Sequence, residues 1–539
     1  MPTSSDLRTD PVIRYDDPAV GVPAIDLPVV TPTRSARMPW PVLVTAVLVA
    51  VLLVAPVLVV FGQATAAGTA EASRLLFRPR TAELLRNTLL LLALTVPVTV
   101  LLGCGAAWLV ERTTLPGASV WRTLLLMPLA IPAFVSSYAW TSVLPSVQGL
   151  GGAVFVTALS YYPFVFLPAA ALLRALDQGH LDAARSLGVS GLGTVLRVVI
   201  PQIRPAVAGG SLLVALHLLA EFGVLQMMRY PTFTTAILQQ FAVGFSNAAG
   251  SLLATVLAVL CLGLLAIEVP LRGRRRIARL GPGARQRPIA HRLGGWTVPA
   301  LGALAVLVGL AVIVPAVIVL RWLERAIAGS AVDAGSLLAA TGSSVGLAVL
   351  AGLATTVATL PGAWLLHRYP SRLSVMLERV TYVASALPGV VIGLALVTLA
   401  VQWARPVYQT TALAVAAYTI LFLPRAMVAW RSGLAAAPTE LIEASRSLGV
   451  SGPGTFARVV VPLVLPSALT GFVLVFLATV TELTATLLLA PTGTETLATA
   501  FWSASDELDY VASAPYAAAM IALSAPLTLL LRRQILEQR

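Results

Sequence analysis

Two acidic residues, Glu221 and Glu482, are the best candidates for a chemical role in this sequence, because they occupy equivalent places in two similar stretches. Each lies about twenty residues after a proline, Pro201 or Pro462, which corresponds to about 30 Å along a helix at 1.5 Å per residue. We therefore expect both carboxylates at the far end of a long apolar helix. A facing pair of carboxylates would suit a hard cation with oxygen ligands. The alternative is that each acid pairs with an arginine or orients a helix end.

Other reactive side chains are sparse and form no catalytic pattern. Cys104 and Cys261 lie in different apolar segments without a CxxC or metal-type spacing, so we predict packed thiols. The spacing of the residues does not identify any metal ligands, and His180 stands alone in a polar segment. The chain has no lysine, whereas a P-loop needs one against the β- and γ-phosphates. We predict that the chain is no enzyme, binds no cofactor itself, and leaves any use of ATP to another polypeptide.

The composition predicts an all-α polytopic membrane protein. Hydrophobic residues make up 58% of the chain and charged residues 11%. A bilayer core of about 30 Å is crossed by roughly 20 apolar residues in a helix. Such runs recur twelve times, in two groups of six. The predicted spans are residues 40–62, 87–110, 122–145, 151–174, 201–226 and 249–271, and then 297–320, 343–366, 381–403, 408–430, 462–489 and 511–531.

The basic residues indicate the topology. All 36 are arginine, against 23 acidic residues, and the predicted spans leave most of them on one side. Cytoplasmic loops carry such an excess, so the basic charge reflects orientation and we expect no nucleic-acid partner. The prediction is a multi-pass protein of a bacterial cytoplasmic membrane, surrounded by lipid, with the N- and C-termini in the cytoplasm.

Four segments follow from these patterns. Residues 1–39 are polar and are predicted to be a disordered cytoplasmic tail. Residues 40–271 and 297–533 form two six-span repeats, and residues 272–296 form a basic linker that is too charged to span. Six spans in each repeat give both halves the same orientation. The repeats should therefore be related by an axis along the membrane normal, with any translocation path between them.

The heptapeptide RSLGVSG occurs twice, at Arg185–Gly191 and Arg446–Gly452, within the predicted loops 178–200 and 438–461. In each loop a short helix should end at a glycine with positive φ, Gly188 or Gly449. Ser190 or Ser451 can then cap the second short helix of the loop. The sequence predicts two helix–turn–helix fingers, each joined to the next span. The alternative is an ordinary cytoplasmic loop that was duplicated together with its repeat.

The stretches DAARSLGVSGLGTVLRVVIPQIRP and EASRSLGVSGPGTFARVVVPLVLP resemble the EAA loop of binding-protein-dependent ABC importer permeases. Asp182 replaces the family's glutamate in the first copy, and Ser445 replaces its second alanine in the other. The resemblance implies the type I ABC importer permease fold and a coupling helix that docks on an ATP-binding subunit. The implied coupling residues are Asp182, Ala183, Ala184, Arg185, Gly188, Glu443, Ala444, Ser445, Arg446 and Gly449.

That resemblance also implies partners. They are two copies of an ABC ATP-binding subunit, which hold ATP and Mg, and an extracytoplasmic substrate-binding protein. Three stretches, Ala220–Ile237, Thr481–Trp502 and Pro128–Trp140, resemble the fused permeases of iron(III) importers. Relatives of that group carry thiamine, phosphonates or polyamines, which remain alternative cargoes.

The expected translocation path includes Glu221, Glu482 and Tyr138. For Tyr138 the alternative is an aromatic residue of the interfacial belt. An alternative of another class is a secondary transporter that works without an ATPase. It has little support, because few ionisable residues are found within the predicted spans to couple protons or sodium.

Overall fold

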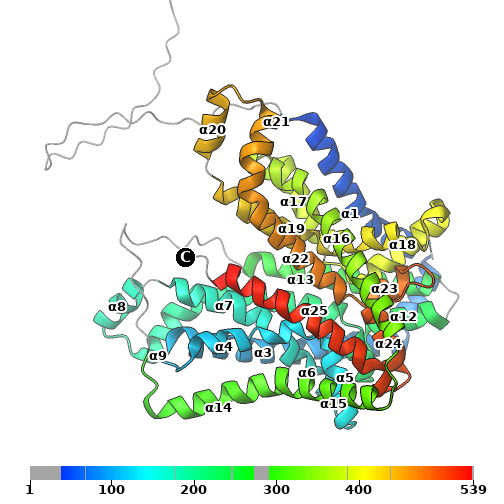
Figure 1. Ribbon diagram of the computed structural model, residues 1–539, viewed down its shortest axis with the longest axis horizontal. Helices are drawn as coiled ribbons and strands as arrows, with labels where there is room; N and C mark the ends of the chain where they lie inside the picture. The colour runs from blue at the N-terminus through cyan, green and yellow to red at the C-terminus, as the bar shows by residue number, and fades with distance from the viewer. Residues whose placement is uncertain are drawn as a thin grey trace, which may run out of the picture. The chain divides into compact units, whose positions relative to one another are not determined.

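The computed structural model describes residues 38–66, 68–176, 178–243, 247–271, 291–384, 386–437 and 439–536. Within these ranges the regular structure is helical, and one isolated bridge joins Thr113 to His291. Residues from Pro39 onward form one compact unit (Figure 1). The all-α class predicted from the composition is confirmed.

The first repeat contains thirteen α-helices and two short helical turns of other types. They are α1 (Trp40–Ala66), α2 (Thr69–Leu76), α3 (Pro79–Arg112), α4 (Ala118–Leu124), η1 (Met127–Ala130), α5 (Ala133–Val143), α6 (Gly149–Tyr161), α7 (Pro163–Ala175), α8 (Gln178–Ser186), α9 (Gly191–Thr194), η2 (Val195–Val199), α10 (Ile200–Ala220), α11 (Gly223–Met227), α12 (Phe233–Val243) and α13 (Asn247–Leu271).

The second repeat follows the same order after a short helical turn. Its elements are η3 (Gly294–Trp296), α14 (Thr297–Val308), η4 (Gly309–Ile313), α15 (Val314–Ala328), α16 (Ala334–Arg368), α17 (Arg372–Ala384), α18 (Gly389–Trp403), η5 (Arg405–Val407), α19 (Thr411–Ala436), α20 (Thr439–Ser447), α21 (Gly452–Thr455), η6 (Phe456–Val460), α22 (Val461–Val480), α23 (Thr484–Leu489), α24 (Leu497–Asp506) and α25 (Tyr510–Leu536).

Ten of the twelve predicted spans correspond to helices that are long and apolar enough to cross a membrane, and the predicted spans 122–145 and 381–403 are broken. Among the described residues, ten helices are long and apolar enough to cross a membrane, and the pair Ala118–Ala130 and Ala133–Val143, bent by 87°, makes an eleventh. The twelfth segment corresponds to the shorter apolar helix α18. Pro132 and Pro388 directly precede α5 and α18. Because the residue before a proline is pushed out of the helical region, each of these spans restarts at its proline.

The predicted segment boundaries meet the described residues at three places. Of the predicted tail 1–39, only Met38 and Pro39 lie in the described part, and residues 272–290 of the predicted linker lie outside it. Helix α1 begins at Trp40, in line with the start predicted for the first repeat. Helix α25 continues to Leu536, past the predicted end at residue 533.

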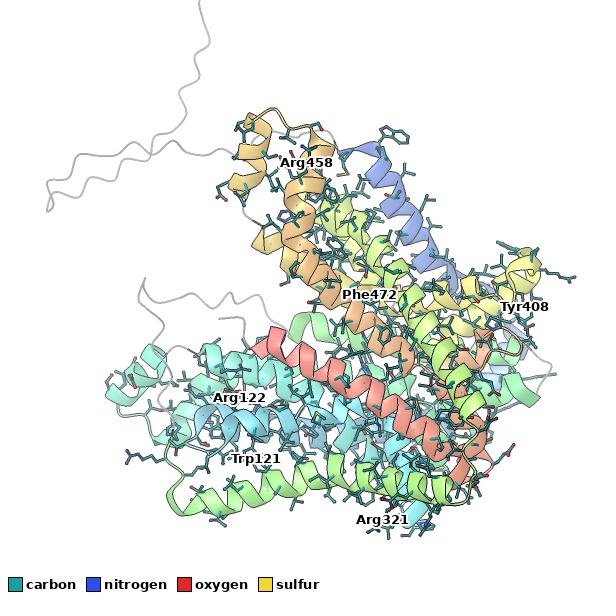
Figure 2. All side chains as sticks on the ribbon, in the orientation of Figure 1. Trp121, Arg122, Arg321, Tyr408, Arg458 and Phe472 are labelled. Carbon is teal, nitrogen blue, oxygen red and sulfur yellow. The ribbon has the colours of Figure 1, made fainter. Side chains whose placement is uncertain are left out.

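Three long helices form the centre of each repeat. In the first repeat α3 and α10 pack on α7, and in the second α16 and α22 pack on α19. Glycines permit the close approach that membrane helices need in the absence of a hydrophobic driving force. A Cβ built on Gly352 of α16 would lie 2.7 Å from the ring of Phe472 of α22, which is labelled in Figure 2.

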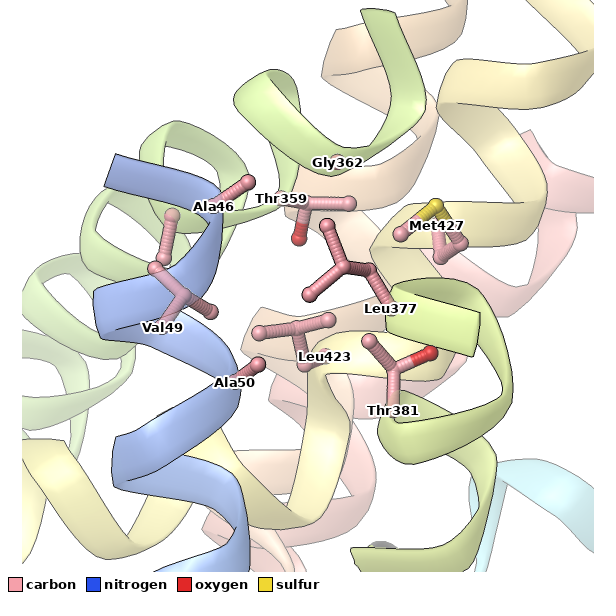
Figure 3. A pocket seen from close by; sticks show the side chains of 10 residues that line it. Ala46, Val49, Ala50, Thr359, Gly362, Leu377, Thr381, Leu423 and Met427 are labelled. Atoms are coloured by element: carbon pink, nitrogen blue, oxygen red, sulfur yellow. The ribbon is translucent and has the colours of Figure 1, made fainter. Parts of the chain in front are cut away.

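The first span of each repeat packs on the opposite repeat. Helix α1 lies against α16, α17 and α18, and α15 lies against α5 and α25. The indole Nε1 of Trp322 on α15 donates to Ser142 Oγ of the first repeat at 3.0 Å. Small residues keep α1 close to its neighbours: Figure 3 shows Ala46 and Ala50 of α1 facing Thr359 across a narrow crevice. The two repeats are therefore interlocked by one helix from each.

Gly103 of α3 offers a direct test of this packing. A Cβ at Gly103 would lie 2.9 Å from the backbone oxygen of Tyr162 and the backbone nitrogen of Phe166. We expect Gly103→Val to lower the free energy of unfolding by about 1–3 kcal/mol, the usual cost of overpacking. Thermal unfolding of the purified chain in detergent, followed by tryptophan fluorescence, measures the change. Gly105→Val is the control, because a Cβ at Gly105 on the same helix meets nothing within 4 Å. Equal effects of the two substitutions would contradict the packing argument.

Candidate functional site

The duplicated heptapeptide forms two fingers with the same backbone geometry, as Figure 1 shows for α8 with α9 and for α20 with α21. Helices α8 and α20 each lead to a glycine with positive φ, +75° at Gly188 and +78° at Gly449. The backbone N–H of Val189 donates to Ala184 O at 3.1 Å, which closes the end of α8 as in a Schellman motif. The predicted helix–turn–helix fingers are confirmed.

A serine caps the second helix of each finger. Ser190 Oγ accepts a hydrogen bond from the backbone N–H of Gly193 at 3.1 Å, and Ser451 Oγ accepts one from Gly454 at 3.4 Å. Such a bond satisfies one of the free N–H groups at a helix start. The predicted caps are therefore present in both copies.

The EAA residues divide into an outward and an inward set. Asp182 and Ala183 are exposed on α8, and Glu443 and Ala444 are exposed on α20. Ala184 and Ser445 face inwards, each with 8% exposure. The side chains of Arg185 and Arg446, two of the predicted coupling residues, lie outside the described part of the chain.

The serine that replaces alanine in the second finger has a structural reason. Ser445 Oγ lies 3.1 Å from Thr455 Oγ1, and both hydroxyls are buried between α20 and α21. Because each hydroxyl satisfies the other, the polar substitution costs little at this buried position. The departure from the family pattern leaves the outward face of the finger unchanged.

Each finger also presents one exposed leucine that the sequence interpretation did not single out. Leu187 and Leu448 are the same residue of the repeated heptapeptide, and each is 82% exposed. The two side chains protrude at equivalent positions of the two fingers. The signal was in the sequence, because a leucine in a polar, duplicated loop has no core of its own to enter.

Each finger runs into the next span without a loop. The π-helical turns η2 and η6 join α9 to α10 and α21 to α22. Pro201 and Pro462 stand two residues after the ends of these turns. A proline cannot donate to the carbonyl four residues earlier and its ring clashes with that carbonyl, which accounts for the wider turn. The second helix of each finger and its following span thus form one continuous helical run, Gly191–Ala220 in the first repeat and Gly452–Val480 in the second, which we call the rod.

Glu221 and Glu482 lie at the far ends of these rods, where α10 and α22 stop. The two carboxylates have the same local role. Glu221 Oε1 accepts from the backbone N–H of Val224 at 3.0 Å, and Glu482 Oε1 accepts from Ala485 at 2.9 Å. Each acid thereby begins the short helix that follows it.

Each acid has one further partner in the apolar part of the chain. The hydroxyl of Tyr161 donates to Glu221 Oε2, and Tyr161 stands near the middle of the apolar stretch Gly149–Ala175. Arg425, near the middle of α19, interacts electrostatically with Glu482. Helix α10 begins at Ile200, one residue before the predicted start, and the apolar stretches Val195–Ala220 and Phe456–Val480 end just before the two acids. Each acid therefore lies at the far end of a long apolar helix, as expected from its spacing to the proline.

The segments that carry the two acids meet between the repeats. A Cβ on Gly223 would lie 3.3 Å from the side chain of Leu483, and the rings of Phe222 and Trp502 are 4.9 Å apart. A Cβ on Gly389 would lie 2.9 Å from Glu482 Oε1, so a larger residue there would press on the carboxylate. The segments that carry the two acids are therefore in contact, and the facing pair of carboxylates stays a prediction.

Two further ionisable residues, His217 and Arg425, accompany the acid pair, and the sequence interpretation missed both. His217 Nδ1 lies 2.8 Å from Leu213 O, and the centre of its ring lies 4.4 Å from that of Phe164, with the two rings tilted by 37°. His217 and Arg425 interact electrostatically, and both side chains keep partial exposure, as Glu221 and Glu482 do. We call His217, Glu221, Arg425 and Glu482 the charged cluster.

Tyr138, the third residue expected in the path, does not join this cluster. It is 1% exposed, and its hydroxyl donates to the backbone oxygen of Tyr510 in the other repeat. Its ring packs edge-on against Phe501 at 5.2 Å. In the structure Tyr138 holds the two repeats together. Among the described residues no group of three or more His, Cys, Asp or Glu side chains could hold a metal ion.

Apolar helices in two equivalent sets, each with a protruding finger joined rigidly to a central span, define a multi-pass membrane permease. The chain belongs to the family described as binding-protein-dependent transport system inner membrane component, which matches residues 38–267 and 358–536. The two matched stretches fall one in each repeat.

Three relatives show how the repeats correspond to other permeases. The Fe(3+)-transport system permease protein FbpB 2 of Haemophilus influenzae is 34% identical over 502 residues, which cover 92% of this chain and 99% of that protein. The molybdate/tungstate transport system permease protein WtpB of Thermococcus kodakarensis is 27% identical over 36% of this chain and 81% of its own length. The sulfate transport system permease protein CysW of Escherichia coli is 28% identical over 33% of this chain and 67% of its own. The matches to the last two relatives are each about as long as one repeat.

Proposed function

We propose that this chain is the permease subunit of an ABC importer that moves iron(III) from an extracytoplasmic binding protein into the cytoplasm. ATP hydrolysis on two copies of a separate ATP-binding subunit drives the transport. The main support is the similarity to an Fe(3+)-transport permease along nearly the full length of both chains. The chain itself performs no covalent chemistry, and both of its termini lie in the cytoplasm.

In this proposal each finger docks on one ATP-binding subunit. The exposed acid and small residues of α8 and α20 allow a close approach, and Leu187 and Leu448 enter apolar hollows of the partner. The positive charges of Arg185 and Arg446 fix the position of each finger along its ATP-binding subunit. When the subunits close on ATP, the fingers move together and the rods α10 and α22 follow.

The charged cluster is the proposed site through which the cation passes. Glu221 and Glu482 supply oxygen ligands of the kind that hard cations prefer. Carboxylates within a membrane span are costly and are generally found where an ion or substrate passes. Their position between the repeats agrees with a translocation path along the axis that relates the repeats.

Uptake by the reconstituted transporter tests the function. We expect proteoliposomes that hold this chain with its ATP-binding subunits, and receive iron(III) on the cognate binding protein, to accumulate radioactive iron only with ATP inside. Thiamine, a phosphonate and a polyamine, each with its binding protein, serve as competing cargoes. Accumulation of one of them in place of iron would overturn the cargo. Uptake driven by an ion gradient without ATP would instead support a secondary transporter.

A further inference from the structure

Arg425 is the one member of the charged cluster whose charge has no close partner among the described residues. Its guanidinium lies 4.9 Å from the ring centre of Phe422 on its own helix, and no hydrogen bond or ion pair within 4 Å holds it. The side chain is partly exposed, so it is not sealed in packed protein. An arginine near the middle of a span is expensive to keep there unless it serves a function.

Arg425 interacts with other members of the charged cluster. Glu482 and His217 both interact with it electrostatically, and Glu482 in turn interacts with Glu221. Glu482 Oε1 accepts a hydrogen bond from the backbone N–H of Ala485 at 2.9 Å, and no ion pair within 4 Å joins Glu482 to Arg425 in the described part of the chain. The guanidinium of Arg425 and the carboxylate of Glu482 therefore interact through space without forming a direct ion pair.

The two repeats differ at this position. Alignment of Pro168 with Pro424 puts Ala169 opposite Arg425. Ala169 is fully buried within its own repeat. The acids are duplicated but the arginine is not, so one positive charge faces two negative ones. Duplication alone would have produced a symmetric site, and the single arginine breaks that symmetry.

We propose that Arg425 is a tethered counter-ion of the acid pair, which occupies the place of the cargo while the site is empty and must be displaced by it. This inference rests on the proposed role of Glu221 and Glu482. Like charges within a protein repel strongly at the low effective dielectric there, so an empty acid pair needs a compensating cation. A monovalent ion gains no more from the two carboxylates than the guanidinium does. A multivalent ion gains more, so Arg425 selects for multivalent cargo.

Binding of Tb³⁺ to the purified permease with its ATP-binding subunits tests this assignment. Tb³⁺ is a hard trivalent ion, and Tyr161 beside Glu221 can sensitise its luminescence. We expect Arg425→Gln to bind Tb³⁺ at least about tenfold more tightly, because the competing charge is gone. We also expect Na⁺ to compete for that site in Arg425→Gln and not in the parent chain. Arg425→Lys keeps the charge and should bind Tb³⁺ like the parent chain.

Arg405→Gln is the matched control, since Arg405 is exposed and lies at the end of α18 in the same repeat. Unchanged or weaker Tb³⁺ binding in Arg425→Gln would contradict the counter-ion role of Arg425, even if the parent chain takes up iron. Unchanged Tb³⁺ binding after Glu221→Gln with Glu482→Gln would remove the acid pair as the cation site, and the counter-ion with it. If Arg425→Gln and Arg425→Met both fail to assemble while Arg425→Lys assembles, the charge is needed by the empty site, as proposed. If Arg425→Lys also fails, the assignment is wrong.

Discussion

Replacement of both Gly188 and Gly449 by proline is expected to abolish transport and the co-purification of the ATP-binding subunit, while the chain still inserts into the membrane. Both glycines have φ near +75°, whereas proline fixes φ near −65°. The turn between the two helices of each finger cannot form with that backbone. Uptake by proteoliposomes and affinity purification through the ATP-binding subunit measure the two losses.

The control for this prediction lies in the same loops. Gly191 and Gly452 begin the second helices, and a Cβ at either position meets nothing within 4 Å. Gly191→Ala with Gly452→Ala should therefore leave assembly and transport nearly unchanged. Normal uptake in the double proline variant would remove the fingers from the coupling mechanism.

The substitution of Glu221 and Glu482 by glutamine is expected to lower iron uptake at least about tenfold, because a neutral amide is a far poorer ligand for a hard cation. The fingers are distant from these residues in sequence and keep their turns, so the ATP-binding subunits should still co-purify. Initial uptake rates in proteoliposomes give the first result, and the composition of the purified complex gives the second.

The double variant Glu83→Gln with Glu495→Gln is the control, because it also removes two negative charges from the chain. Glu83 pairs with Arg80 near the start of α3, and Glu495 precedes α24, so both lie away from the charged cluster. This control variant should transport iron at the parent rate. Unimpaired uptake after loss of both Glu221 and Glu482 would show that the cargo takes another route.

The fingers could be predicted from the sequence because their geometry is encoded locally. A glycine that must adopt positive φ and a serine that caps the next helix act within a few residues, and both recur in the second copy. The spans were found because hydropathy averages over many residues. The same averaging conceals the breaks before Pro132 and Pro388, since a proline hardly changes the mean of an apolar window.

The charged cluster could be predicted only in part. Equivalent positions revealed Glu221 and Glu482, but their bonds to the backbone of Val224 and Ala485 depend on the short helices that follow, which the sequence analysis did not predict. His217 and Arg425 each stand singly in an apolar segment, so neither disturbs the signal of its span. The exchange of α1 and α15 between the repeats depends on contacts between residues far apart in the sequence, which no local pattern reports.

The unbroken run from each finger into its span has a mechanical consequence. The helix Val195–Ala220 has 26 residues. At 1.5 Å per residue such a lever is about 39 Å long, and a tilt of about five degrees at one end would shift the other by about 3 Å. A shift of that size is the length of a hydrogen bond. A small push at the finger end of this helix is thus enough to make or break a ligand contact at the opposite end, because the helix continues through the π-helical turn and past Pro205 without a loop.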